Sequence, residues 1–262
     1  MTTSWDRAKV LITGGTRGIG HAVAALLVNE GARVVVAGTT QAGADLVAAR
    51  LNAGPGTAYG IGLAIDGTEP CANELVRRAA SAMGGLTAVV NAAGGATVGH
   101  ALTLPWDAWQ EDWNLKFWGY FAVIRAAVPY LLQSSGVVVN VLGVTGKDPN
   151  TRLACATAIN GALRGLTKIL ADDLAPSGIR VVAVNPGATD TDLLGRMAEG
   201  YGQLEQLPAS EVLERLRRSG PMGRLPSASD IAAAVKFLLS DEAQFVTGTS
   251  IDVDGGAHRG LA

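Results

Sequence analysis

Short runs rich in β-branched residues alternate along this chain with longer stretches in which apolar residues recur every three or four positions. The short runs predict strands over 9–13, 33–37, 57–63, 87–91, 136–141, 180–185 and 250–253. The longer stretches between them predict amphipathic helices. This alternation is typical of a parallel sheet with helices on both faces. We therefore expect one α/β domain over residues 1–262, built on a doubly wound, seven-stranded parallel sheet.

Two of the helical stretches carry wide apolar stripes. The first runs through Trp106, Trp109, Trp113, Phe117, Tyr120, Ile124, Val128 and Leu131, and the second through Ile159, Leu163, Leu166, Leu170 and Leu174. Stripes of this width suit burial against the sheet together with a partner subunit. Burial within one chain is the alternative, and the pattern does not separate the two.

Residues 192–225 interrupt the strand–helix rhythm. They are polar, carry Gly200, Gly202, Pro208 and Pro221, and are helical in part, over 210–218. A long excursion late in such a fold usually covers a substrate site. We predict a substrate flap here, and a plain surface insertion is the alternative.

Composition removes several functional classes. The chain has 262 residues, 48% apolar and 17% charged, which suits one large folded domain and excludes a disordered chain. A net charge of −2 gives no sign of nucleic-acid binding. The N-terminal residues lack the apolar core of a signal peptide, and no apolar run reaches the roughly 18 residues that span a bilayer. We therefore expect a cytoplasmic protein with reduced Cys71 and Cys155, and no spacing of metal-ligand type occurs.

The strongest chemical motif follows the first strand directly. Residues 13–20 read Thr-Gly-Gly-Thr-Arg-Gly-Ile-Gly and open a helix predicted over 21–29. Glycines permit a tight turn and a close approach of pyrophosphate, and the helix N-terminus supplies free N–H groups. This placement between a strand and a helix predicts a nucleotide-binding turn, with a purely structural turn as the alternative.

The end of the second strand bears on which dinucleotide would bind. An acidic residue there would bind the ribose 2′-hydroxyl of NAD, but Thr39 and Thr40 stand in its place and no acid occurs before Asp45. Arg17 lies in the glycine turn, and its guanidinium suits a 2′-phosphate. The pattern favours NADP(H); the alternative is a solvated Arg17 and weak selectivity.

These motifs resemble those of the short-chain dehydrogenase/reductase family over nearly the whole chain, with β-ketoacyl-carrier-protein-reductase-like members the most similar. Residues 91–94 are similar to its Asn-Asn-Ala-Gly turn, residues 186–191 to its Pro-Gly segment, and residues 247–256 to its last strand. The resemblance implies a Rossmann-type fold and a homo-oligomer, a dimer or tetramer in which the two stripes pair with their copies. The NADP(H)-binding residues expected from the motifs are Gly14, Thr16, Arg17, Gly18, Ile19, Gly20, Thr39, Thr40, Asp66, Asn91, Ala92, Gly94, Pro186, Gly187, Thr189 and Thr191.

The catalytic half of the family pattern is missing. Counted from these motifs, the family's Asn, Ser, Tyr and Lys positions hold Lys116, Gly143, Ala156 and Asn160. Asn114 is a competing choice for the first position, but it would point to another side of the helix. None of the four tyrosines is close in sequence to Ala156. The resemblance thus implies an atypical member in which the family's usual proton donor is absent.

Lys116 and Asn160 are our candidate catalytic residues. The family has Asn on one helix and Lys on the other, and this chain has the same two side chains exchanged. A cation would then reach the pocket from the opposite helix, with a pKa lowered by partial burial. The alternative is that Lys116 extends to solvent and Asn160 has no function.

Other substitutes are weaker. His100 lies on a segment that borders the site, and it is either a proton donor or a simple loop residue. Lys147 and Asp148 follow the fifth strand, where they could bind a charged substrate or form a solvated pair. His21 and His258 are expected outside the pocket.

Three functions remain consistent with the sequence. The first is an NADP(H)-dependent oxidoreductase acting on an unknown carbonyl or alcohol through a non-standard active site. The second is a lyase or isomerase that reuses the pocket without redox chemistry. The third is a catalytically inactive, cofactor-binding pseudoenzyme that acts as a partner subunit.

Overall fold

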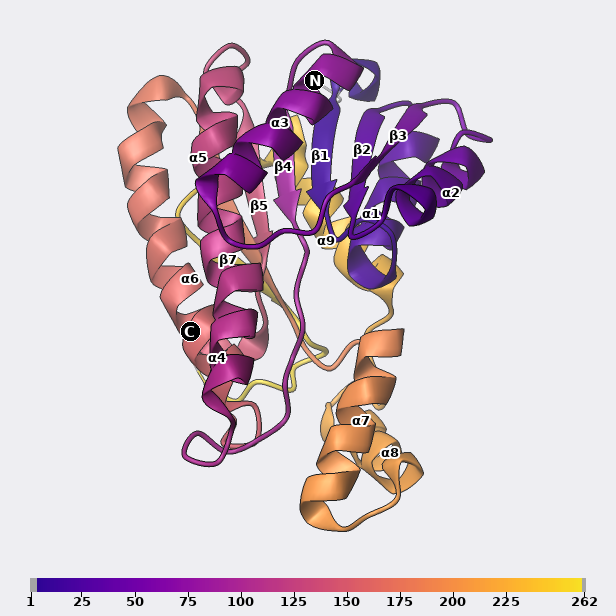
Figure 1. Ribbon diagram of the computed structural model, residues 1–262, viewed down its shortest axis with the longest axis vertical. Helices are drawn as coiled ribbons and strands as arrows, with labels where there is room; N and C mark the ends of the chain where they lie inside the picture. The colour runs from indigo at the N-terminus through magenta and orange to yellow at the C-terminus, as the bar shows by residue number, and fades with distance from the viewer. Residues whose placement is uncertain (1–3, 261–262) are drawn as a thin grey trace.

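The computed structural model describes residues 4–260, and its core is a parallel sheet (Figure 1). Within these residues the sheet has seven strands in the order β3-β2-β1-β4-β5-β6-β7. They are β1 (Lys9–Thr13), β2 (Arg33–Gly38), β3 (Thr57–Gly62), β4 (Ala88–Asn91), β5 (Val137–Val141), β6 (Arg180–Pro186) and β7 (Ser250–Val253). The predicted doubly wound sheet is confirmed, and no strand boundary differs from the prediction by more than one residue.

Helices cover both faces of the sheet. Helices α1 (Gly18–Asn29), α2 (Gln41–Leu51) and α9 (Ala228–Leu239) pack on one face, and α3 (Glu69–Met83), α5 (Gly119–Leu131) and α6 (Ala154–Leu174) on the other. The strands from β1 to β6 therefore point side chains into apolar layers on both faces. Burial on both sides explains why strands such as β5 read as continuous valine-rich runs.

The first apolar stripe forms one long helix with an irregular centre. It comprises α4 (Trp106–Asp112), the π-helical segment η2 (Trp113–Trp118) and α5. Tyr120 and Ile124 are fully buried, whereas Trp106 is 76% exposed. A π-helical turn holds more residues than an α-helical turn, so it changes which side chains face inward. Lys116 lies within this turn and is buried, while Asn114 is exposed.

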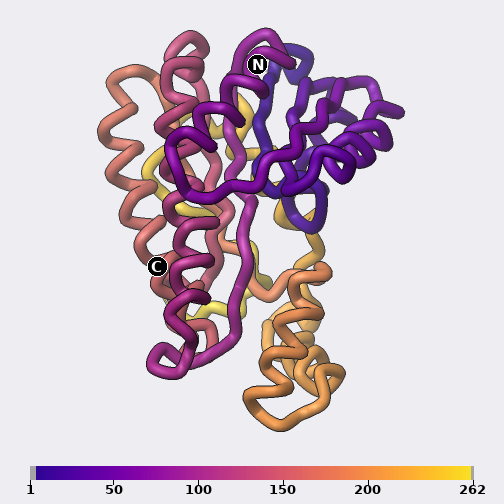
Figure 2. The backbone as a smooth tube through the Cα atoms, viewed as in Figure 1, coloured from indigo at the N-terminus to yellow at the C-terminus, as the bar shows by residue number. Residues whose placement is uncertain are grey.

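The carboxyl ends of the strands meet a small helical subdomain. Helices α7 (Asp192–Glu205) and α8 (Ala209–Ser219) occupy the predicted flap region and project beyond the sheet (Figures 1 and 2). Their apolar side chains pack with Leu153 and Ala156 at the start of α6. The described part of the chain contains no helix that is long and apolar enough to cross a membrane.

The order of the strands indicates where a ligand site can form. The chain winds outward from β1 through β2 to β3 in one direction, and from β4 to β7 in the other. In open α/β sheets a crevice opens at the carboxyl ends of the strands where this reversal occurs. The glycine turn after β1 and the segment after β4 both lie at that edge.

Candidate functional site

A groove of about 290 Å³ lies at the reversal point, and the glycine turn forms one of its walls. The residues on its wall that the motifs predicted are Gly14, Thr16, Arg17, Gly18, Ile19, Gly20, Thr39, Ala92, Gly94 and Thr191. Arg196, on α7, also lines it and was not predicted. Arg17 and Arg196 are both exposed, so two arginines contribute to the lining of the groove.

The geometry of the turn requires glycine. Gly14 and Gly18 have φ angles of +64° and +56°, in the left-handed region. A Cβ on Gly14 would lie 2.7 Å from Ala93 Cα, and one on Gly20 would lie 2.3 Å from the Gly14 carbonyl oxygen. The turn therefore packs directly on the loop after β4 and leaves the α1 N-terminus open. These residues fit the pyrophosphate of a dinucleotide.

Six predicted cofactor residues lie outside the groove wall, and three of them, Thr40, Asp66 and Asn91, stabilise the loops around it. Hydrogen bonds from Thr68 hold the Asp66 carboxylate and lower its pKa. The Thr40 hydroxyl accepts from the Gly43 N–H and caps α2. Asn91 is fully buried and donates to Asn140 Oδ1 at 3.0 Å. These contacts hold the loops behind the groove in place.

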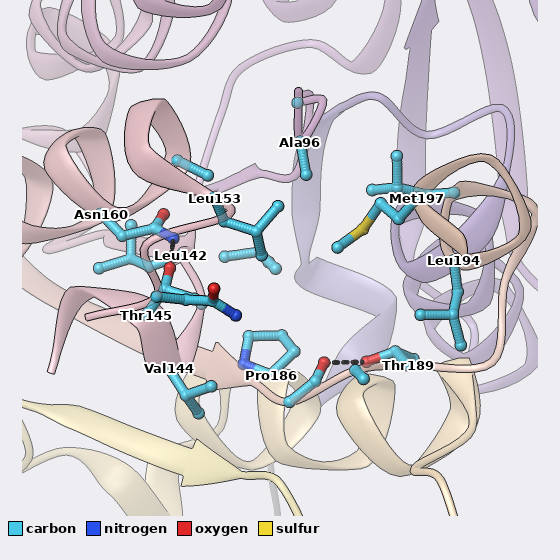
Figure 3. A pocket seen from close by; sticks show the side chains of 18 of the residues that line it. Ala96, Leu142, Val144, Thr145, Leu153, Asn160, Pro186, Thr189, Leu194 and Met197 are labelled. Atoms are coloured by element: carbon cyan, nitrogen blue, oxygen red, sulfur yellow. Dashed lines mark hydrogen bonds between the residues drawn. The ribbon is translucent and has the colours of Figure 1, made fainter. Parts of the chain in front are cut away.

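A second cavity of about 590 Å³ adjoins the groove. Five residues line both spaces: Ile19, Ala92, Gly94, Thr191 and Leu193. The predicted Pro186, Gly187 and Thr189 line the larger cavity alone. Figure 3 shows apolar side chains around it, among them Leu153, Leu194 and Met197. A ligand that spanned the groove would therefore end against a mainly apolar chamber.

Lys116 lines this chamber and is buried. Its Nζ donates to the Leu142 carbonyl oxygen at 2.9 Å, and its side-chain carbons lie beside Gly94. Burial lowers the pKa of Lys116 from its ordinary 10.5 to about 8, against the opposing charge of Asp112. The alternative in which Lys116 extends to solvent is therefore wrong, because the side chain is buried and its amine binds the Leu142 carbonyl.

Two buried groups lie behind Lys116. Asp112 has a buried carboxylate oxygen with no hydrogen-bond partner among residues 4–260. Cys155 is a free thiol, and burial together with Asp112 raises its pKa to about 12. The thiol is therefore protonated at neutral pH, and Asp112 is the charged group that favours the ammonium form of Lys116.

Asn160 lines the same chamber and is 3% exposed. Its Nδ2 donates to the Thr145 hydroxyl at 2.9 Å (Figure 3). Thr145 belongs to the short turn η3 (Val144–Gly146) that follows β5 and Gly143. Asn160 thus links the turn after β5 to α6 by a hydrogen bond. Leu142, whose carbonyl binds Lys116, lies on the same chamber wall.

Two tyrosines that are remote from Ala156 in sequence line the chamber. Tyr120 is buried and donates its hydroxyl to the Val141 carbonyl at 3.1 Å. Tyr201, from α7, packs in the same apolar cluster as Ala156 and accepts from Asn150 Nδ2 at 3.2 Å. Burial raises the pKa of both phenols. Only the fold brings them together, so no local sequence signal identifies them.

The expectation that His258 lies outside the pocket is wrong. His258 lines the chamber, with Nδ1 3.7 Å from the Asp148 carboxylate. Asp148 also lines the chamber, but Lys147 is turned away into a 2.9 Å ion pair with Asp252, so the two are not a solvated pair. His100 is exposed, and its Nδ1 lies 3.1 Å from the Thr151 carbonyl. No cluster of three His, Cys, Asp or Glu side chains within the described residues is placed to hold a metal ion.

Comparison with known proteins agrees with this architecture. A family model described as enoyl-(acyl carrier protein) reductase matches residues 14–258. The 2-(S)-hydroxypropyl-CoM dehydrogenase 3 of Xanthobacter autotrophicus is 35% identical, covering 94% of this chain and 95% of the relative. The 4-formylbenzenesulfonate dehydrogenase of Comamonas testosteroni is 38% identical, covering 97% and 98%. A short-chain dehydrogenase from Burkholderia cenocepacia, solved in complex with NADP, superposes with a TM-score of 0.84 at 31% identity, covering 95% of this chain and 97% of that chain.

The chain therefore belongs to the short-chain dehydrogenase/reductase family of oxidoreductases, as its glycine and Pro-Gly motifs predicted. Members of this family use nicotinamide cofactors.

Proposed function

We propose that this protein is an NADP(H)-dependent oxidoreductase that interconverts an alcohol and a carbonyl compound through a non-standard active site. The observation that carries the proposal is the position of Lys116. Its amine lies on the wall of a chamber that opens directly onto the nucleotide groove. A titratable group is thus present beside the cofactor site even though the family's Tyr position holds Ala156.

Residues on both sides of the crevice support the choice of cofactor. Arg17 and Arg196 supply positive charge to the groove, Thr39 supplies a hydroxyl, and no acid follows β2 there. Guanidinium groups bind phosphate oxygens strongly. Thr189 and Thr191, after β6, would hold the nicotinamide end beside the chamber. When bound, the cofactor supplies or accepts the hydride.

Lys116 would hold and move the proton. One of its hydrogens is donated to Leu142, which leaves the others for a substrate oxygen. With a pKa of about 8, the side chain is mostly protonated at pH 7 and gives up its proton at only slightly higher pH. Effective acid–base catalysts have pKa values near the working pH. Reduction should therefore weaken as pH rises through about 8, and oxidation should strengthen.

The chamber suggests the substrate class. Its walls are mainly apolar, so a ring or short carbon chain would be buried there, with its oxygen toward Lys116. The Comamonas relative is named for an aromatic aldehyde, 4-formylbenzenesulfonate. We therefore favour aromatic or alicyclic aldehydes and the corresponding alcohols.

Hydride transfer tests the proposal directly. NADPH deuterated at the transferring C4 position is incubated with benzaldehyde, 4-formylbenzenesulfonate and cyclohexanecarbaldehyde, and mass spectrometry measures deuterium in the alcohol product. Lys116→Met should lower the rate by about 10²–10⁴, the usual contribution of a positioned proton donor. Lys168→Met is the matched control, because Lys168 is exposed on α6. An unchanged rate in Lys116→Met would remove Lys116 from the mechanism.

A second candidate function rests on what the chamber lacks. Gly143 and Ala156 both line it and carry no hydroxyl, at the positions where the family resemblance expects Ser and Tyr. That observation favours a cofactor-binding subunit without catalytic activity. Tight NADPH binding without deuterium transfer to any probe, together with copurification of an active homologous subunit, would establish it.

A further inference from the structure

The turn after β5 is held from two sides. Lys116 Nζ binds the Leu142 carbonyl at 2.9 Å, and Asn160 Nδ2 binds the Thr145 hydroxyl at 2.9 Å. Gly143 lies between these two anchor points and presents no side chain to the chamber. Gly146 packs against the backbone of Asn160, where a Cβ would lie 2.8 Å from the Asn160 carbonyl carbon. The turn therefore has little freedom to move.

Thr145 has an uncommitted hydroxyl proton. Because the Asn160 amide donates to it, its own proton points elsewhere, and it has no acceptor within residues 4–260. Most other hydroxyls on the chamber wall already donate to backbone carbonyls, namely those of Tyr120, Thr189, Thr191 and Ser219. Two further hydroxyls line the chamber: that of Thr151, which is an exposed residue, and that of Tyr201, which lies on α7 in the outer wall.

We propose that Thr145 donates a hydrogen bond to the carbonyl oxygen of the substrate and that Asn160 is the positioning residue that aims its hydroxyl. The inference rests on the proposed oxidoreductase function. Lys116 and Thr145 then approach the substrate oxygen from the two sides of Gly143. Donors that are already oriented stabilise an oxygen that gains negative charge during the reaction. The substrate class is a carbonyl compound whose oxygen enters between an ammonium and a hydroxyl group.

This arrangement explains two residues together. Gly143 supplies no hydroxyl, and Thr145, two residues later in the same turn, supplies one. Asn160 carries no charge and cannot act as a cation, but its carboxamide reaches Thr145. The hydroxyl that the family resemblance expects at position 143 would thus be supplied from position 145, and Asn160 on α6 would orient it.

Two measurements on the full-length protein test the proposal. The first is the kcat and KM of aldehyde reduction with NADPH. Thr145→Val should lower kcat by about 10- to 100-fold, as loss of an oriented donor does, with a smaller change in KM. Thr145→Ser, which keeps the hydroxyl, should stay within a few-fold of the parent. Thr157→Val is the matched control, because Thr157 lies on α6 one turn from Asn160 and bonds only to Asn150.

Asn160→Leu should also lower kcat in the parent, but it should add little in the Thr145→Val background, because a positioning residue acts through the group it aims. Fully additive losses would overturn the assigned role of Asn160.

The second measurement requires no turnover. Benzaldehyde labelled with 13C at the carbonyl is bound to the complex with NADP+, which cannot reduce it, and its C=O stretching band is recorded by infrared spectroscopy. Thr145→Val should move the band to higher wavenumber, while NADPH affinity measured by fluorescence stays unchanged and reports correct folding.

The inference alone would be overturned if the parent reduces aldehydes and Thr145→Val changes neither kcat nor the position of the band. Loss of NADPH affinity with an unchanged band would assign Thr145 to the cofactor instead and would also overturn it. Absence of both carbonyl binding and reduction in the parent would overturn the proposed function and the inference with it.

Discussion

A side chain on Gly143 and the carboxamide of Asn160 would occupy the same space. A Cβ atom built on Gly143 lies 2.8 Å from Asn160 Nδ2, closer than a real Cβ comes to any such atom. The carboxamide cannot easily move away, because it is hydrogen-bonded to Thr145 at 2.9 Å. The Asn160 carboxamide on α6 therefore occupies space that is free because residue 143 is glycine.

This match predicts coupled effects on stability. Gly143→Ser alone should lower the free energy of unfolding by about 1–3 kcal/mol, the usual effect of overpacking. The same substitution in an Asn160→Ala background should cost less, because the space is then free. A double-mutant cycle from urea unfolding measures the coupling. Gly161→Ser is the control, since a Cβ there meets nothing within 4 Å. Purely additive effects would mean that the two residues do not compete.

Restoring the family's side chains should create ordinary ketone reduction. We expect negligible reduction of simple test ketones by the parent. Activity should rise when Lys116→Asn, Gly143→Ser, Ala156→Tyr and Asn160→Lys are combined, since the phenol supplies a proton donor beside the nicotinamide. Gly143→Ser is combined with Asn160→Lys because the Asn160 carboxamide is the group that a side chain at position 143 would meet. The same set with Ala156→Phe fills the space without the hydroxyl and should stay inactive. If the parent reduces test ketones at rates typical of the family, the assignment of these four positions is wrong.

The buried amine of Lys116 should make stability depend on pH. Its pKa is about 8 in the folded protein and 10.5 when unperturbed. Between these values the unfolded chain keeps a proton that the folded chain has released, so stability rises with pH across this window. At about 1.4 kcal/mol per pH unit, the full effect is about 3 kcal/mol.

Lys116→Met removes this titration. The difference in free energy of unfolding between the Lys116→Met variant and the parent should favour the variant most at pH 7. This difference should shrink by up to about 3 kcal/mol toward pH 10.5. Chemical unfolding across this range checks the trend, and Lys168→Met, an exposed lysine, should show none. A constant difference between parent and Lys116→Met would contradict burial of the ammonium group.

NADPH should bind more tightly than NADH. The 2′-phosphate of NADPH would be held by Arg17, with Thr39 beside it on the groove wall. Arg17→Ala should remove the preference, a loss of about 10- to 100-fold in NADPH affinity if one or two charge-assisted hydrogen bonds are lost. Fluorescence titration measures both cofactors, and Arg50→Ala on the exposed side of α2 is the control. Equal affinity of the parent for NADPH and NADH would refute this prediction.

The protein should form a homo-oligomer, a dimer or tetramer, through the outer sides of α4, α5 and α6. Trp118 and Ile169 are 47% and 58% exposed on these helices, although most of the two apolar stripes is buried within the chain. Burial of such side chains between copies would be favourable. Ile169→Glu should shift light-scattering mass toward the monomer, whereas Leu46→Glu, exposed on α2, should not. A monomeric parent at micromolar concentration would rule this out.

The sequence by itself determined the sheet, the glycine turn and the family. Strands and helices followed from hydrophobic periodicity, which depends on near neighbours in the chain, and no strand boundary moved by more than one residue. The glycines at 14, 18 and 20 were readable because tight turns impose local backbone requirements that only glycine meets. The choice of Lys116 over Asn114 rested on the spacing from the motif that ends at Gly94, together with local helix geometry.

Only the tertiary structure decided what surrounds the chamber. Tyr201 and His258 reach it from α7 and from the chain after β7, and Thr145 is aimed by Asn160 across a turn–helix contact. These contacts join residues that are far apart in the chain or that belong to different elements, so periodicity and motif spacing carry no signal for them. The burial of Lys116 needed the π-helical segment and the packing of Gly94 over its side chain. Burial sets the pKa of an amine through desolvation, and desolvation depends on every element packed around it.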